Sequence, residues 1–251
     1  MDAIGDQIIE MILQGESASQ KSSHWQKHTK GFAIREGKVS GIDGFSPRST
    51  KFPLSDLLHR IAQRKNFNNL SIPFNSIWYQ LGKEATKKQN RSFDLDILRQ
   101  VFTLDFLENH LHLDSTSNIC IIGDGQANFT SIALQSNFFN KIISVNLPEV
   151  LLSDWELIKK LNFQESTAVA RSESDCQEFF KSTKRFAMIQ ASDCNVLSAK
   201  PIDIFINIAS FGEMKAETVA NYFEIIKSST KGAASELSSA KKGKGSRGKK
   251  A

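Results

Sequence analysis

Apolar residues recur at helical spacing through the first part of the chain. Ile4, Ile8 and Ile12 lie on one face of an amphipathic segment, as expected for a helix that packs against a core. Similar faces follow at Leu57, Leu58 and Ile61, at Ile77, Trp78 and Leu81, and between Phe93 and Leu107. We therefore predict a mainly helical N-terminal region, residues 1–110, that forms a subdomain beside a sheet.

After residue 110 the pattern changes to short apolar runs that alternate with helical segments. The runs predict strands at Ile119–Ile122, Ile142–Val145, Phe186–Ile189 and Ile202–Ile206, and the segments predict helices at Phe129–Phe139, Glu149–Leu161 and Ala216–Ile226. Apolar strands separated by helices are typical of a parallel sheet covered on both faces. We predict an α/β fold, a Rossmann-like doubly wound parallel sheet, over residues 111–230.

Glycine or polar residues follow each predicted strand. Gly123–Asn128 follows the first, Asn146 the second, Ser192 and Asp193 the third, and Asn207–Ser210 the fourth. Ligands of such sheets bind at the carboxyl ends of the strands, so these residues predict one binding site. Glycine also permits positive φ and lets a ligand approach the backbone closely.

Charge is distributed unevenly along the chain. The net charge is +5, but Lys231–Ala251 holds seven basic residues and one acidic residue, so this tail carries +6 and the rest −1. The tail has almost no large apolar residue and predicts disorder. The body therefore offers no net attraction to nucleic acid, and a nucleic-acid partner is expected only through the tail.

Other features point to a cytoplasmic protein, and no residue is assigned as a metal ligand. The three cysteines have no metal-type spacing and are interpreted as reduced and mostly buried. His24 and His28 have helical spacing but no third ligand in view, while His59 and His110 are interpreted as structural. We find neither a secretory signal nor a run long enough to span a membrane.

Three segments together resemble the putative sugar O-methyltransferase family, a branch of the class I, Rossmann-like S-adenosylmethionine-dependent methyltransferases. They are the glycine turn at Gly123–Gln126, the run Leu147–Leu152 after the second strand, and Ser210–Met214 with Asn221 and Tyr222 after the fourth. The resemblance spans residues 118–227. It implies S-adenosyl-L-methionine as cofactor and a sugar or glycoconjugate hydroxyl as methyl acceptor, in polysaccharide or glycoconjugate synthesis.

The resemblance also implies roles for individual residues. Gly123, Asp124, Gly125, Gln126 and Ala127 would wrap the methionine part of the cofactor, Asn146 with Leu147 would hold the ribose, Ser192 and Asp193 would lie by the adenine amine, and Asn207 near the sulfonium. Methyl transfer to a hydroxyl needs a base, for which Glu213 and His112 are the candidates. Glu213 has a second interpretation, as an acid preceding the N-terminus of the last predicted helix. His112 has a second interpretation too, as a structural histidine like His59 and His110.

The chain departs from the family in ways that keep other functions open. Ile121 stands where an acidic residue is usual, Ala127 where a third small turn residue is usually glycine, and the further strands that complete the sheet are replaced by the tail. One alternative is therefore a non-catalytic, methyltransferase-like interaction protein, in a truncated or divergent member. A nicotinamide-dependent oxidoreductase is a further hypothesis that rests on the glycine turn alone, which lacks the third glycine of the dinucleotide fingerprint.

Overall fold

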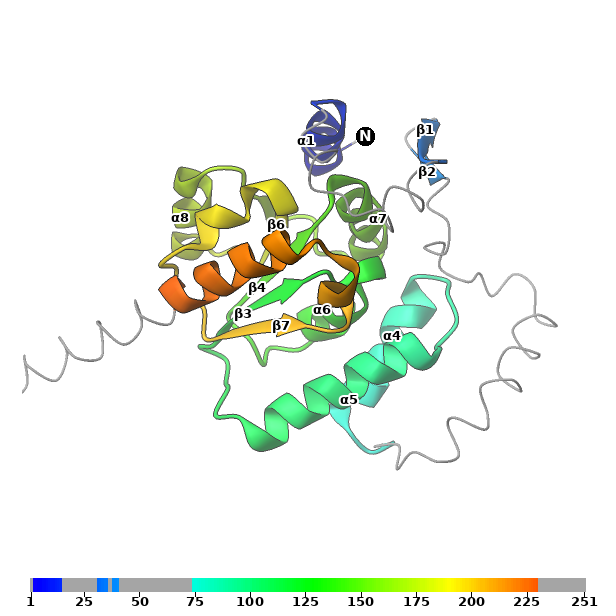
Figure 1. The fold of residues 1–251 in the computed structure, drawn as a ribbon. Coiled ribbons are helices and arrows are strands. Elements are labelled where there is room, and N and C mark those ends of the chain that lie inside the picture. Colours follow the sequence, from blue (N-terminus) through cyan, green and yellow to red (C-terminus); the bar gives the residue numbers. More distant parts are fainter. Residues whose placement is uncertain (1, 15–30, 36–37, 41–73, 230–251) are drawn as a thin grey trace, which may run out of the picture.

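The computed structural model describes residues 2–14, 31–35, 38–40 and 74–229 (Figure 1). Several sequence-based predictions concern residues outside these ranges. They are the helical segment at Leu57–Ile61, the histidines at 24, 28 and 59, and the basic tail at 231–251.

The centre of the fold is a five-stranded sheet in which every strand pairs in parallel. Its strands are β3 (Asn118–Ile122), β4 (Lys141–Asn146), β5 (Thr167–Val169), β6 (Phe186–Gln190) and β7 (Ile204–Asn207), in the spatial order β5-β6-β4-β3-β7. The predicted α/β class and parallel sheet are confirmed. The four predicted strands correspond to β3, β4, β6 and β7.

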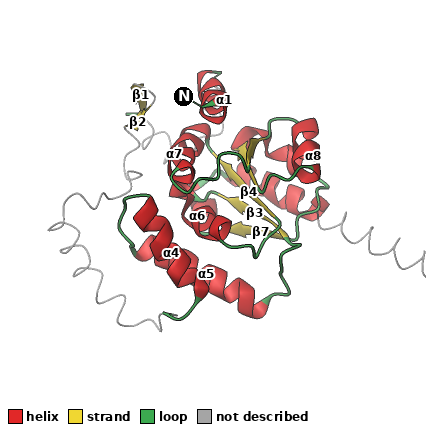
Figure 2. Cartoon of the chain, turned by 180° about the vertical axis from the view of Figure 1, so that it is seen from behind, coloured by secondary structure: helices red, strands yellow, loops and turns green. Residues whose placement is uncertain are grey.

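Alternate residues of each strand enter two separate cores, one on each face of the sheet. Ile119 and Ile121 of β3 join a cluster that includes residues of α1, α4, α5, α6 and α7, whereas Cys120 and Ile122 join a second cluster that includes α8 and the helix at 216–229. This is the period of two expected for a strand buried on both sides. Figures 1 and 2 show helices on both faces.

The larger core is closed by five helices, all of them anticipated by the apolar spacing. They are α1 (Ala3–Leu13), α4 (Ile77–Lys88), α5 (Leu95–His110), α6 (Asn128–Gln135) and α7 (Pro148–Lys159). Side chains of Asp2, Ser76 and Asp94 cap the first three, each accepting a backbone N–H of the first turn. Pro148 begins α7, where its missing N–H costs no helical hydrogen bond.

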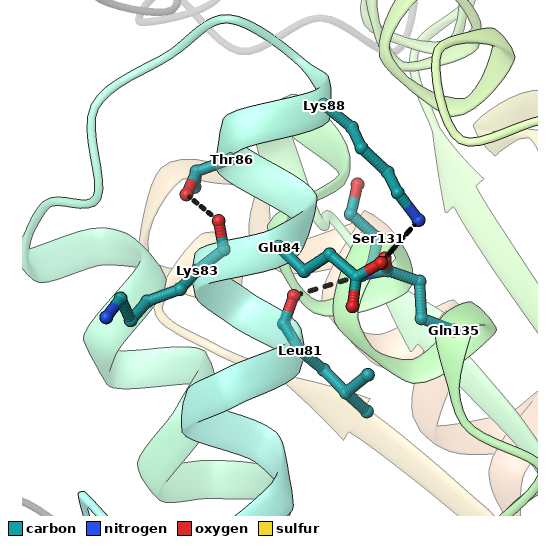
Figure 3. Close-up of polar contacts among 7 residues, drawn as sticks. All are labelled: Leu81, Lys83, Glu84, Thr86, Lys88, Ser131 and Gln135. Carbon is teal, nitrogen blue, oxygen red and sulfur yellow. Dashed lines mark hydrogen bonds and ion pairs between the residues drawn. The ribbon is translucent and has the colours of Figure 1, made fainter.

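The helices that precede the sheet in sequence share its core. α4 packs against α6, and the Gln135 side chain donates to the carbonyl of Leu81 (3.0 Å) while Lys88 donates to Gln135 (3.5 Å; Figure 3). Trp78 of α4 is fully buried in the same cluster as Ile119 of β3. The described N-terminal helices therefore share one hydrophobic core with the sheet. A separate N-terminal subdomain is not confirmed and stays a prediction.

Some elements were not anticipated. A small antiparallel pair, β1 (Ala33–Arg35) and β2 (Lys38–Ser40), lies within the region expected to be helical or loop. β5 and the following helix α8 (Glu173–Lys181) were also missed, because β5 has only three residues and α8 buries only Cys176 and Phe179. The capping box of Ser172 and Asp175 was the available sequence signal for α8.

The strand order places a switch point beside β3. The chain runs from β3 outward through β4, and after β6 returns to β7 on the other side of β3. Ile122 therefore lies opposite Val145 of β4 and Asn207 of β7, which aligns the carboxyl ends of three strands. Within the described residues β7 pairs with β3 alone and forms one edge of the sheet.

Candidate functional site

A cavity of about 260 Å³ lies at the switch point. Its walls come from the turn after β3, the ends of β4 and β6, the segment after β7, the helix at 216–229, and one face of α5. Of the residues predicted to form the site, seven line it: Gly123, Asp124, Gly125, Gln126, Asn146, Leu147 and Glu213. Ala127, Ser192, Asp193, Asn207 and His112 are not among its lining residues.

The turn after β3 holds three residues with positive φ. Gly123 has φ 76°, Gln126 65° and Ala127 47°. The Gly123 N–H donates to the Val145 carbonyl (2.9 Å), and the Arg91 guanidinium donates to the Gln126 carbonyl (3.2 Å). Non-glycine residues rarely take this conformation, so the surrounding bonds are needed to hold the turn.

Asp124 occupies the N-terminus of α6. Its carboxylate accepts the backbone N–H groups of Phe129 (2.9 Å) and Thr130 (2.7 Å). These amides and the helix dipole make a natural anion site. Here the anion is a side chain of the same chain, so the place where a dinucleotide fold binds pyrophosphate is already filled.

A buried ionic cluster lies under the turn. The Arg91 guanidinium donates to Asn128 Oδ1 (2.6 Å) and faces the buried carboxylates of Asp124 and Asp154. Burial raises the pKa of Asp124 to about 6, although hydrogen bonds from Thr130 and Phe129 and the charge of Arg91 act in the opposite direction. Burial, reinforced by the negative charge of Asp124, also raises the pKa of Asp154. The Arg91 guanidinium thus lowers the pKa values of Asp124 and Asp154, but burial outweighs it and both pKa values stay raised.

Asn146 lines the cavity, but its amide group is used within the chain. Its Oδ1 accepts the Leu147 N–H (3.1 Å), and its Nδ2 donates to Asp154 Oδ2 (3.4 Å). The resemblance implies an acidic residue at position 146. The buried Asp154 explains the amide found there, because a second carboxylate at this position would face the carboxyl group of Asp154.

Asn207 and Ser210 fasten β7 to β3. Asn207 Nδ2 and Ser210 Oγ both donate to the Ile122 carbonyl (2.9 and 3.0 Å), and Asn207 Oδ1 accepts the Phe211 N–H (3.2 Å). Asn207 and Ser210 also contact each other directly. The Asn207 amide group is thus used in hydrogen bonds within the chain and does not line the cavity, whereas Ser210 does.

The predicted adenine contacts lie beyond the cavity. Asp193 Oδ2 accepts from Gln190 Nε2 (2.9 Å), and Ser192 Oγ donates to Asp193 Oδ1 (3.4 Å). The residue after β6 that lines the cavity is Ala191.

The two candidate bases are placed very differently. Glu213 is half-buried in the short helix η3 (Ser210–Glu213) and lines the cavity. His112 is exposed and lies between α5 and the start of β3, whereas the cavity lies at the other end of that strand. The structure does not bring His112 and Glu213 together, and only Glu213 keeps the geometry of a candidate base.

One wall was missed entirely by sequence reasoning. Asp96, Arg99 and Gln100 of α5 line the cavity, and Arg91 donates a hydrogen bond to the Gln126 carbonyl of the turn. Asp96 and Arg99 form an exposed ion pair (3.3 Å), but Gln100 is only 7% exposed. The one signal in the sequence was a polar residue, Gln100, among the apolar positions of Phe93–Leu107.

Other chemistry is less prominent in the described part of the chain. There, no group of three or more His, Cys, Asp or Glu side chains is arranged to hold a metal ion, and the three cysteines are buried and free. Among these residues, no helix combines the length and the apolar character needed to cross a membrane. Comparison of the sequence with protein-family models and with curated proteins gives no match.

Proposed function

We propose that the chain is an S-adenosylmethionine-dependent methyltransferase that methylates a sugar hydroxyl of a glycan or glycoconjugate. The observation that carries the proposal is the cavity at the switch point, bordered by Gly123–Gln126, Asn146 and Glu213. The carboxyl end of a doubly wound sheet is where nucleoside ligands bind. A cytoplasmic location belongs to the same proposal.

The charges around the cavity favour this cofactor over a dinucleotide. Asp96, Asp124 and Glu213 line it, and Arg99 is the one basic residue among its described lining residues. Asp124 already fills the N-terminus of α6, which leaves no place there for a pyrophosphate. A cationic, phosphate-free nucleoside suits such a lining, whereas a nicotinamide dinucleotide does not.

The residues have simple tasks in this reaction. Bound S-adenosylmethionine would supply an electrophilic methyl group on its sulfonium. The turn and Leu147 would hold the cofactor, and the walls of the cavity would align the acceptor with it. Glu213 would accept the proton that the acceptor hydroxyl loses as its oxygen is methylated.

The experiment is a calorimetric titration of the purified chain with S-adenosylmethionine and S-adenosylhomocysteine. We expect micromolar binding, loss of it in Ala191→Phe, which fills the cavity, and its retention in Ala191→Ser. NADH should bind more weakly than either. If a demonstrably folded chain binds neither methionine nucleoside at millimolar concentration, the proposal fails.

A second candidate is a non-catalytic, methyltransferase-like interaction protein. It is favoured by the internal use of the Asn146 and Asn207 amides and by Ser210, which packs against Gly123 from within the chain. This candidate predicts a folded protein that is indifferent to the cofactor and binds a protein partner.

A further inference from the structure

Asn128, the first residue of α6, uses one atom of its side-chain amide within the chain and leaves the other available. Its Oδ1 accepts from the Arg91 guanidinium (2.6 Å). A guanidinium can only donate, so the atom that faces Arg91 is the oxygen, and the amide nitrogen Nδ2 points away from Arg91. Nδ2 has no acceptor among the residues that the structure describes.

This available donor belongs to a residue of the cavity wall. Asn128 is only 7% exposed and lines the cavity. Its Nδ2 differs from the fully inaccessible polar atoms of the described chain, because it retains accessible surface. A ligand in the cavity can therefore reach it. A nearly buried donor is stabilised by an acceptor, and here the acceptor has to come from the contents of the cavity.

The surroundings of Asn128 favour an anionic acceptor. The buried Arg91 guanidinium polarises the amide through Oδ1, which makes Nδ2 a stronger donor. The N-terminus of α6 adds the positive end of a helix dipole. Asp124 already takes the backbone amides of Phe129 and Thr130, and these amides with Arg91 offset its negative charge. The Asn128 side chain is thus the donor that remains available to a ligand at this end of the helix.

We propose that Asn128 is a cofactor-binding residue, and that its Nδ2 donates to the carboxylate of the methionine part of S-adenosylmethionine. The inference rests on the proposed function and adds a residue to the site. Asn128 directly follows the turn Gly123–Ala127, which would wrap the methionine part. The carboxylate is the one anionic group of this cofactor, so it is the group that the polarised amide would select.

The test is calorimetric titration of the whole chain with S-adenosylhomocysteine and with its decarboxylated form, which lacks only the carboxylate. Asn128→Ala removes the donor. Asn128→Asp keeps an oxygen that accepts from Arg91 and replaces the donor with a second oxygen. The matched controls are the same two substitutions at Asn109, which is exposed on α5 and does not line the cavity. Thermal unfolding verifies that each variant is folded.

We expect Asn128→Ala to weaken S-adenosylhomocysteine binding by about tenfold, the scale of one lost hydrogen bond to a charged group. Binding of the decarboxylated form should change by less than about twofold. Asn128→Asp should weaken S-adenosylhomocysteine further, because it places a negative charge against the carboxylate. The Asn109 variants should bind both ligands as the wild type does. The two ligands share every other group, so a variant that merely disturbs the turn would weaken both equally.

Two results would overturn the inference while the wild type still binds S-adenosylhomocysteine, and they would leave the proposed function in place. One is equal weakening of both ligands in the Asn128 variants. The other is an unchanged S-adenosylhomocysteine affinity in these variants. If Asn128→Ala does not fold, the same comparison in Asn128→Asp decides. A folded wild type that binds neither ligand would reject the proposed function itself, and this titration comes before those of the variants.

Discussion

Ser210 packs directly against Gly123, so closely that a Cβ atom on Gly123 would lie 2.5 Å from the Cβ of Ser210. Gly123 also has a φ of 76°, which side chains disfavour. The first glycine of the turn is thus required by the chain itself, through a hydroxyl group that ties β7 to the end of β3. The sequence analysis gave two reasons for a glycine in this turn, positive φ and close approach of a ligand; the first is confirmed at Gly123, and Ser210 adds a steric reason from within the chain.

Gly123→Ala should lower the free energy of unfolding by roughly 3 kcal/mol or more, from left-handed strain and steric overlap together. In a Ser210→Gly background the penalty should shrink, because only the strain remains. Urea unfolding measures both. Gly212→Ala is the matched control, since a Cβ there meets nothing within 4 Å. Equal penalties in the two backgrounds would contradict the steric account.

The stability of the fold should fall as pH rises from about 4 to 6. The pKa of Asp124 is about 6 in the folded chain and near 3.9 when unfolded. Between these values the folded state binds more protons, so the stabilisation from this group is complete at low pH and lost through this window. Its size is roughly 2–3 kcal/mol. Asp154 acts in the same direction because its pKa is also raised.

Urea unfolding at a series of pH values tests this dependence. Asp124→Asn should flatten the slope without removing it, because Asp154 still titrates. Asp175→Asn is a control of opposite sign: hydrogen bonds from Arg171 and Ser172 outweigh burial and lower the pKa of Asp175, so its stabilisation is lost as pH falls. A wild-type stability that rises between pH 4 and 6, and does so equally in Asp124→Asn, would contradict the burial of Asp124.

Asn146→Asp should destabilise the fold rather than improve the site. An acid at this position would restore the usual ribose contact, but it would place a carboxylate against Asp154 in place of the Nδ2 donor at 3.4 Å. We expect a loss of roughly 2–4 kcal/mol at pH 7, the scale of an uncompensated buried charge. Asp154→Asn in the same chain should recover much of it. A double-mutant cycle by urea unfolding measures this coupling, and its absence would show that the two side chains do not interact.

Glu213→Gln should slow methyl transfer by about 100-fold or more, the usual contribution of a general base. S-adenosylhomocysteine affinity should not change. Transfer of labelled methyl groups from S-adenosylmethionine to a panel of sugar acceptors measures the rate. Glu217→Gln, on the exposed face of the helix at 216–229, is the control. Full activity of Glu213→Gln would remove Glu213 from the mechanism.

The sequence by itself determined the parts of this protein that depend on local periodicity. Apolar runs at β3, β4, β6 and β7, separated by segments of helical spacing, predicted the α/β class and the order of elements, because burial on both faces of a strand demands such runs. They also predicted one rim made of Gly123–Asn128, Asn146, Ser192 with Asp193, and Asn207–Ser210. Most of the turn, Asn146 and residues 208–210 line the cavity, whereas Ser192, Asp193 and Asn207 do not. The strand β5 and the helix α8 were not predicted, because they bury too few apolar residues to give a recognisable hydrophobic pattern.

Tertiary structure decided what those rim residues do. Asp124 accepts N-terminal amides of α6, and Asn146 donates to the buried Asp154. Ser210 packs against Gly123, and His112 does not line the cavity. It also brought one face of α5 to the lining of the cavity. Each outcome depends on a partner distant in sequence or on which way a side chain turns. Periodicity specifies which face of an element is buried, but not which polar group on another element it will meet.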